Sequence, residues 1–263
     1  RKAKVNNKHI YCATVVGNTC MHHLFLGLNP RQLAIAPYVP VVQQAVTVTP
    51  KDIKLNINSQ GAIYVLPNIA GFVGADTVGV ILATNLEHVE VPTIAIDLGT
   101  NGEIVLNSGK QMVACSTAAG PAFEGAQITY GMRAAEGAIE KVIISEHDMK
   151  VQVIGNTKIK GICGSGLIDL IAQLVKNGVI EPSGRIVGPE QLLPQVDFLK
   201  NRLIANGRSF DFILAFPDES ATGEVIVLTQ RDVRELQLAK GAILAGIKIL
   251  LREVGLEMQD IGQ

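Results

Sequence analysis

Residues 94–106 read IAIDLGTNGEIVL, and this stretch decides which fold the sequence predicts. An apolar strand ends on the carboxylate of Asp97, passes through a turn with two glycines, and returns as a second apolar strand. Gly99 and Gly102 have no Cβ atom, so backbone N–H groups of the turn can approach a polyphosphate closely. The stretch therefore predicts a strand–turn–strand unit that can bind phosphate.

The polar residues of this turn suit magnesium–phosphate chemistry. Thr100 and Asn101 add side-chain donors, and Asp97 could hold Mg²⁺ through its water shell while the ion neutralises charge on a phosphoryl group. Glu103 could orient a water molecule. The alternative is an ordinary β-hairpin, because Asn-Gly between apolar runs is the strongest short hairpin signal. A plain hairpin does not explain why a carboxylate ends an otherwise apolar strand.

Composition indicates a globular chain and argues against two classes of partner. Apolar residues make up 48% and charged residues 18% of the 263 residues, which suits a sizeable core in one or two domains and excludes intrinsic disorder. With 23 basic and 24 acidic residues the net charge is -1, so a nucleic-acid partner is disfavoured. No apolar run approaches the roughly 18 residues of a membrane span, so we expect no membrane partner.

The cysteines and the paired histidines give no metal-site signal. Cys12, Cys20, Cys115 and Cys163 lie far apart without a CxxC pair, so we expect no iron–sulfur or zinc site here, but reduced, mostly buried thiols in a cytoplasmic protein. Residues 22–23 are adjacent histidines on an expected helix, where they point apart and are expected to be structural. The chain begins with Arg rather than Met, and we expect it to be a piece of a longer protein.

Strand and helix patterns are mixed along the whole chain, which predicts an α/β fold in two lobes. Strands are expected at residues 10–16, 45–48, 63–66, 93–96, 104–106, 111–115, 138–145, 150–154 and 225–228. Helices are expected after a cap at residues 18–19, and at residues 71–86, 167–176 and 229–254. The last of these should begin with a capping box of Thr229 and Asp232 and end at Gly255. Residues 184–206 carry no clear pattern.

Seven segments, taken in order, resemble one family of proteins. DLGTNGE resembles the second phosphate loop of the acetate/sugar kinase, heat-shock ATPase and actin superfamily. The C-terminal ATPase region of the reductive activators of corrinoid proteins, an iron–sulfur protein family, is a closer match. The segments similar to it are VVGNTCMHHLFLGLNP, APYVPVV, YVLPNIAGFVGADTVGVILAT, IAIDLGTNGEIVLNSG, ACSTAAGPAFEGAQITYGMRAAEGAIEKV, GICGSGLIDLIAQLVKNGVI and LTQRDVRELQLAKGAILAGIKILL.

This resemblance implies a fold, a reaction and partners. The fold is a two-lobed, actin-like ATPase fold of the ribonuclease H type, incomplete in this chain, with residues 1–92 as the remainder of the first lobe with the interlobe helix and residues 93–263 as the second. The reaction is ATP-dependent reduction of cob(II)alamin to cob(I)alamin on a partner corrinoid protein. ATP and magnesium are the implied cofactors, an iron–sulfur cluster lies in a module outside this chain, and a homodimer is implied. Because the first phosphate loop and the adenosine motif are missing, we expect this stretch alone to be inactive.

Three further groups of residues are candidates for the nucleotide site. Gly120 and Glu124 could line the cleft, with Glu124 near the metal, or form a tight packing corner. The loop at residues 161–166, with Gly164, Ser165 and Gly166, could present N–H groups and the Ser165 hydroxyl to an anion, or serve as a glycine-rich helix entry. Gln237 and Lys240, three residues apart on one helix, could contact adenosine or form a solvated face.

Two other functions stay open at this point. A small-molecule kinase of the same superfamily would transfer phosphate from ATP to a sugar or carboxylic acid. A non-catalytic module would serve docking and dimerisation only.

Overall fold

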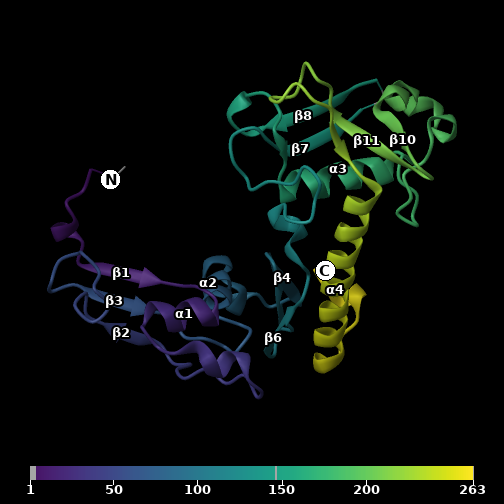
Figure 1. Ribbon diagram of the computed structural model, residues 1–263. Coiled ribbons are helices and arrows are strands. Elements are labelled where there is room, and N and C mark those ends of the chain that lie inside the picture. The colour runs from purple at the N-terminus through teal and green to yellow at the C-terminus, as the bar shows by residue number, and fades with distance from the viewer. Residues whose placement is uncertain (1–3, 146, 263) are drawn as a thin grey trace. The chain divides into compact units, whose positions relative to one another are not determined.

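A computed structural model describes residues 4–145 and 147–262, and these residues divide into two units (Figure 1). Unit 1 holds the described residues up to Asp97, residues Glu103–Thr117 and those from Ala245 onward. Unit 2 holds Leu98–Gly102 and Ala118–Leu244. The turn of the predicted phosphate-binding segment therefore belongs to unit 2, and the two strands beside it belong mostly to unit 1.

The first sheet of unit 1 has β3 (Ala62–Val65) at its centre, parallel to β1 (Cys12–Val15) and antiparallel to β2 (Val46–Val48). Ile63 and Val65 are buried while Ala62 and Tyr64 are exposed, which is the alternation of a strand with one covered face. All three strands were predicted from the sequence, and their register pairs Cys12 with Ala62 and Val46 with Val65.

The helices of unit 1 show where local signals are sufficient and where they are not. α1 (Thr19–Phe25) begins at the predicted cap, because the side chain of Asn18 accepts a hydrogen bond from the Met21 N–H at 2.9 Å. α2 runs over Ala75–Thr84, so the expected helix at 71–86 was too long. A Cβ atom at Gly71 would lie 2.0 Å from the Tyr38 carbonyl oxygen. This glycine is needed for a close approach before the helix rather than within it.

The second sheet of unit 1 contains the predicted hairpin. Its order is β4 (Thr93–Leu98), β5 (Gly102–Asn107) and β6 (Met112–Thr117), and the residues at 104–106 in the central strand are fully buried. The end of α4 (Gln230–Val254) packs against this sheet at Gly246, where a Cβ atom would lie 2.5 Å from Cγ2 of Thr117. The predicted stop at Gly255 is confirmed, with φ at 71°.

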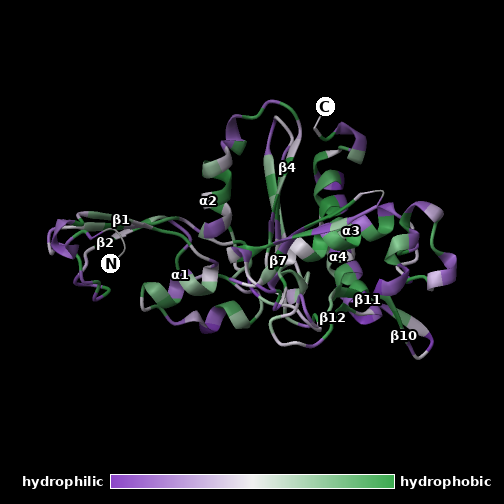
Figure 2. Ribbon diagram, turned by 90° about the horizontal axis from the view of Figure 1, so that it is seen from above, coloured by the Kyte–Doolittle hydropathy of each residue, from purple (hydrophilic) through white to green (hydrophobic). Residues whose placement is uncertain are grey.

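Unit 2 contains the other two sheets and one large core. One sheet has the order β8 (Met149–Val153), β7 (Ala138–Ile144), β9 (Gly161–Ile162), and α3 (Gly164–Lys176) packs on β7. The other has the order β10 (Leu203–Asn206), β11 (Ser209–Ala215), β12 (Ile226–Leu228). Figure 2 shows the apolar colouring along α3. The core of unit 2 includes Ile139, Leu170, Leu174, Phe212 and Leu228.

The predicted capping box of α4 is confirmed. Asp232 accepts from the Thr229 N–H at 2.8 Å, and the Thr229 hydroxyl accepts from the Asp232 N–H at 3.2 Å. Short 3-10 helices connect the larger elements: η1 (Asn7–His9), η2 (Pro30–Ala34), η3 (Leu86–His88), η4 (Pro121–Glu124), η5 (Ile154–Asn156), η6 (Pro189–Gln191), η7 (Pro194–Arg202) and η8 (Met258–Asp260). The mixed α/β class predicted from the sequence is confirmed.

Candidate functional site

The hairpin of β4 and β5 places the carboxylate of Asp97 in an open position. β4 continues through Asp97 to Leu98, so the strand ends two residues later than the expected range of 93–96. Asp97 is exposed and forms no ion pair with any residue that the structure describes. The Gly99 N–H donates to the Asn101 carbonyl at 3.0 Å, and a Cβ atom at Gly99 would contact only that oxygen, at 3.6 Å. The turn is thus a true hairpin turn whose first glycine faces open space.

Glu103 lies half-buried on β5, next to two other acidic residues of unit 1. Burial is the largest cause that raises the pKa of its carboxyl, and the charges of Asp76 and Asp97 raise it further. The Ser116 hydroxyl on β6 donates to Glu103 Oε1 at 3.1 Å and opposes this shift. The result is a carboxyl that takes up protons more readily than an exposed glutamate, next to negative charge that a cation would neutralise.

Asp76 is the residue of this group that the sequence analysis did not select. It lies in the first turn of α2, where acidic residues are common because they interact favourably with the helix dipole. That local explanation hides its proximity to Glu103, which only the folded chain reveals. An acidic residue two positions after Gly74, at the start of a helix that follows a glycine-rich turn, was the available signal.

The residues that the structure describes include no group of three or more His, Cys, Asp or Glu side chains that could hold a metal ion. Mg²⁺ does not require such a group, because it keeps several waters and is often held by one or two carboxylates together with substrate phosphates. The exposed oxygens of Asp97 fit that mode of binding, in which the ion arrives with a nucleotide. The assignment of Asp97 as a metal ligand stays a prediction.

In unit 2, the turn of the hairpin is bonded to the segment at 120–124, twenty residues further along the chain. The Gly120 N–H donates to the Thr100 carbonyl at 2.9 Å. The Thr100 hydroxyl donates to the carboxylate of Glu124, and both side chains are exposed. The fold therefore brings together Thr100, Gly120 and Glu124, three candidates that the sequence placed in separate motifs. Of the other two candidates in the turn, Asn101 is exposed and Gly102 is buried.

The end of η4 also has the tight packing that was the alternative interpretation of this segment. A Cβ atom at Gly125 would lie 2.4 Å from the Met132 nitrogen, whereas one at Gly120 would meet nothing within 4 Å. Both glycines have positive φ, at 80° and 81°. Gly125 is thus a packing glycine, and Gly120 is a turn glycine with open space beside it.

The predicted start of the helix at residue 167 is wrong, because α3 already begins at Gly164. Residues 164–166 form its first turn. A Cβ atom at Gly164 would lie 2.1 Å from the Phe123 carbonyl oxygen, and one at Gly166 would lie 2.2 Å from that of Ile139. These glycines let α3 pack closely on η4 and β7. Ser165 is exposed beside them, so anion binding at this helix start stays a prediction.

Gln237 and Lys240 are both exposed on α4. Gln237 is partly engaged, since its Nε2 donates to the Ser183 carbonyl at 3.2 Å and its amide lies against Gly184. Gln230 fixes the same turn, donating to the Gly184 carbonyl at 2.7 Å. Gln237 is therefore not simply part of a solvated face. An adenosine contact at Gln237 or Lys240 stays a prediction.

The expectation of mostly buried thiols is wrong. All four cysteines are unpaired, but Cys12 and Cys20 are exposed, because they lie on the outer faces of β1 and α1. Cys115 is half-buried, which raises the pKa of its thiol, and Cys163 is buried. Among the described residues, no helix combines the length and the apolar character needed to cross a membrane.

Comparison with protein families finds two adjoining matches. A family model described as the C-terminal domain of RACo, the ASKHA domain, matches residues 91–263. ASKHA denotes the acetate/sugar kinase, heat-shock and actin superfamily. A second model, the RACo middle region, matches residues 1–89. These matches confirm the superfamily that the hairpin motif indicated.

Individual proteins give the same result. The chain is 40% identical over 264 residues to the corrinoid activation enzyme RamQ of Eubacterium limosum, covering 99% of this chain and 44% of the relative. It is 29% identical over 221 residues to the [Co(II) methylated amine-specific corrinoid protein] reductase of Methanosarcina barkeri, covering 76% and 36%. A solved structure, "Reductive activator for corrinoid,iron-sulfur protein", superimposes with a TM-score of 0.84 at 40% identity, covering 100% and 41%. The chain thus spans less than half the length of these relatives.

Proposed function

Because the chain belongs to the family of reductive activators of corrinoid proteins, we propose that it forms the nucleotide-binding core of a protein that reduces cob(II)alamin to cob(I)alamin with ATP. The observation that carries this proposal is the hairpin of β4 and β5. Its turn offers donors and open space, and its strands carry exposed and half-buried carboxylates. This combination suits a phosphate group that arrives with a divalent cation.

The residues of the hairpin divide the work between them. The Thr100 hydroxyl and backbone N–H groups of the turn would bind phosphate oxygens, apart from the Gly99 N–H, which donates to the Asn101 carbonyl. Asp97 would hold Mg²⁺ through water, and when bound, that ion neutralises charge on the phosphoryl group. Glu103, whose pKa burial raises, would orient a water molecule and accept its proton.

Glu124 has a different role in this proposal from the metal contact first considered. Its carboxylate accepts the hydrogen bond of the Thr100 hydroxyl, which is the donor that a phosphate oxygen would need. A carboxylate and a phosphate are both anionic acceptors of such a bond. We therefore propose that Glu124 occupies the phosphate donor of the turn until a nucleotide displaces it.

Further parts of the proposal concern the whole protein. The electron would come from an iron–sulfur cluster held outside this chain, and the partner would be a corrinoid protein, as the printed names of the relatives support. A homodimer is proposed because α4 exposes Leu238 and Ile249, at 69% and 65%. The unpaired thiols support the cytoplasm as the compartment.

The division into lobes is also a proposal, with residues 1–92 in the first lobe and 93–263 in the second. The adjoining family matches at 1–89 and 91–263 support this boundary. The two spatial units do not follow this boundary, since Glu103–Thr117 lies after residue 93 but belongs to unit 1. We prefer the boundary between the family matches for the lobes, because a division by spatial contacts can assign a strand to the unit it packs against rather than to the unit that precedes or follows it in the chain.

The substitution Asp97→Asn in the full-length protein tests the function. We expect ATP-dependent formation of cob(I)alamin, followed by its absorbance, to fall by at least about tenfold, since the amide cannot neutralise the ion. Asp218→Asn, an equally exposed acidic residue in a turn of unit 2, should leave the rate unchanged.

Unchanged activity of Asp97→Asn would remove the proposed role. Transfer of phosphate to a small sugar or carboxylic acid without a corrinoid protein would favour the kinase alternative. Tight binding of a corrinoid protein without any nucleotide binding would favour a docking module.

A further inference from the structure

Two loops of unit 1 form an exposed apolar surface at one end of the first sheet. The first loop, residues 35–43, leads towards β2, and the second, residues 66–72, follows β3. Because β2 runs antiparallel to β3, both loops lie at the same end of the sheet. The first loop contains APYVPVV, a segment that has no part in the nucleotide chemistry proposed above.

Contacts between the two loops make this surface continuous. The Asn68 N–H donates to the Gln43 carbonyl at 2.8 Å, and Asn68 Nδ2 donates to the Val42 carbonyl at 3.2 Å. The rings of Tyr38 and Phe72 lie 5.2 Å apart between their centroids. The apolar patch consists of the side chains in these loops that are 41–57% exposed, namely Ile35, Tyr38, Val39, Val41, Ile69 and Phe72.

The helix α1 fixes both loops. The Thr19 hydroxyl donates to the Ala70 carbonyl at 2.8 Å, and His23 Nε2 accepts from the Val41 N–H at 2.9 Å. His23 is fully buried, and its Nδ1 lies 2.7 Å from the Thr19 carbonyl oxygen, so this histidine has the structural role expected of it. The loops therefore present the patch from a fixed support, which reduces the conformational entropy lost when a partner binds.

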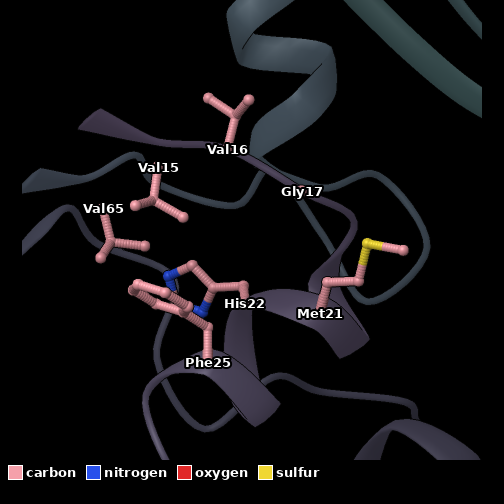
Figure 3. A pocket seen from close by; sticks show the side chains of 7 residues that line it. All are labelled: Val15, Val16, Gly17, Met21, His22, Phe25 and Val65. Atoms are coloured by element: carbon pink, nitrogen blue, oxygen red, sulfur yellow. The ribbon is translucent and has the colours of Figure 1, made fainter. Parts of the chain in front are cut away.

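The inner side of α1 rests on the first sheet (Figure 3). Val15 and Val65 of the sheet lie across from His22 and Phe25 of α1, around a small cavity. The ring nitrogens of His22 have no hydrogen-bond partner among the described residues and are buried so deeply that a molecule in the cavity does not reach them. The inner side of α1 therefore serves packing, and the surface available to a partner is the patch on the outside.

Positive charge flanks the apolar patch. Residues 1–75 contain seven Lys and Arg side chains and a single acidic one, Asp52, whereas residues 76–263 contain 16 basic and 23 acidic ones. Lys8 precedes β1 and Lys51 follows β2, so both lie at the end of the sheet opposite the patch. A strand of four residues measures about 13 Å, so these charges border the patch without interrupting it.

We propose that the apolar patch and its basic flank dock a protein partner whose contact surface is apolar at its centre and acidic at its rim. The inference rests on the proposed function for the identity of this partner, which is then the corrinoid protein. Aromatic side chains in fixed positions are frequent anchors of protein interfaces, and complementary charges around them accelerate association. This part of unit 1 has both features.

Two other occupants agree less well with the distribution of charge. In a symmetric pair of copies the same surface lies on both sides of the interface, so the basic flank would face itself. Anionic membranes are bound by clusters of Lys and Arg next to the apolar side chains, whereas residues 29–50 contain one charged side chain, Arg31.

The kinetics of binding between the full-length protein and the corrinoid protein, measured by surface plasmon resonance, test the patch. We expect Phe72→Ser to raise the dissociation constant at least about tenfold, mainly through faster dissociation. Val39→Ser should weaken binding about threefold or more, and it serves if Phe72→Ser fails to fold. Phe198→Ser, at an exposed phenylalanine of unit 2, should leave the kinetics unchanged.

The basic flank is tested by combining Lys8→Gln and Lys51→Gln. At about 50 mM salt this variant should associate about two- to fivefold more slowly and dissociate at the wild-type rate. The difference should disappear at about 500 mM salt, where screening confines each charge to a few ångströms. Lys158→Gln, at an exposed lysine of unit 2, is the matched control.

Unchanged kinetics in both Phe72→Ser and Val39→Ser would overturn this docking surface and leave the proposed function intact. Failure of the wild-type protein to bind the corrinoid protein would overturn both. The patch would instead belong to a second copy if Phe72→Ser dissociated a homodimer in analytical ultracentrifugation without changing corrinoid-protein binding. It would belong to a membrane surface if the same variant abolished only binding to phosphatidylserine vesicles.

Discussion

Replacing Glu124 with glutamine should strengthen nucleotide binding, although the residue lies in the proposed site. The Thr100 hydroxyl donates to the carboxylate of Glu124, and a nucleotide must break this bond to use the same donor. Hydrogen bonds to charged groups contribute about 1.5–3 kcal/mol and neutral ones about 0.5–1.5 kcal/mol, so the amide should be easier to displace by about 1 kcal/mol. Both side chains are exposed, and solvent screening reduces this to about 0.5–1 kcal/mol.

This difference predicts a dissociation constant for Mg–ATP about two- to fivefold lower than in the wild type. Isothermal titration calorimetry of the full-length protein measures it directly. Glu224→Gln is the matched control, because it removes the same charge from another exposed position of unit 2 and should leave the affinity unchanged.

A double-mutant cycle separates the proposed mechanism from a general charge effect. Thr100→Val removes the hydroxyl and keeps the shape of the side chain. In that background Glu124→Gln should no longer change the affinity, because the bond that it weakens is already absent. Weaker binding by Glu124→Gln alone would refute the reasoning and would support a contact between Glu124 and the metal.

Three further predictions concern stability. Glu103→Gln should stabilise the protein more at pH 7 than at pH 4. An acid with a raised pKa binds protons preferentially in the folded state, so its contribution to stability is complete below its usual pKa of 4.5 and is lost as pH rises through the folded value. Equal effects of the substitution in urea unfolding at both pH values would contradict this. Gly166→Ala should lower the free energy of unfolding by about 1–3 kcal/mol, because its Cβ atom would overlap the Ile139 carbonyl oxygen. Gly241→Ala on α4 would place its Cβ atom within 4 Å of no other group, and it should raise the free energy of unfolding by up to about 1 kcal/mol. Similar melting temperatures for the two variants would refute this. Asp232→Asn should cost about 2 kcal/mol in thermal unfolding, because the fully buried carboxylate accepts three hydrogen bonds of 2.8–3.0 Å, and an unchanged melting temperature would show that these bonds contribute nothing.

Features fixed by neighbours in the sequence were predictable. The cap at Asn18 and the box at Thr229 and Asp232 need only residues within one helical turn. The hairpin at residues 93–107 was readable because glycine and asparagine between apolar runs favour one local conformation. For each of these, the residue types that create the structure lie next to one another in the chain.

Features fixed by distant contacts were not predictable in this way. The helix starts at Ala75 and Gly164 depend on glycines that pack against remote backbone, which a sequence pattern cannot distinguish from loop glycines. β11 was missed because Asp211 interrupts its apolar run, and the structure shows the carboxylate bonded to Asn206 Nδ2 at 2.8 Å. A polar residue inside a strand becomes acceptable only when its partner is known.

The candidate site shows the same division. The motif at the hairpin selected Asp97, Thr100 and Glu103 from the sequence alone. The bond between Thr100 and Glu124, and the effect of Asp76 on Glu103, depend on how the chain folds back on itself. Sequence reasoning therefore identified the turn that we propose to bind phosphate, and the structure identified the carboxylate, Glu124, that would compete with phosphate for the Thr100 hydroxyl.

A crystal structure of the full-length protein with Mn²⁺ and a non-hydrolysable ATP analogue tests the central claim most directly. We predict that a phosphate oxygen accepts the Thr100 hydroxyl bond, that Glu124 has moved off this donor, and that the anomalous peak of Mn²⁺ lies one water molecule from Asp97. A nucleotide bound elsewhere, with the Thr100–Glu124 bond intact, would contradict the account.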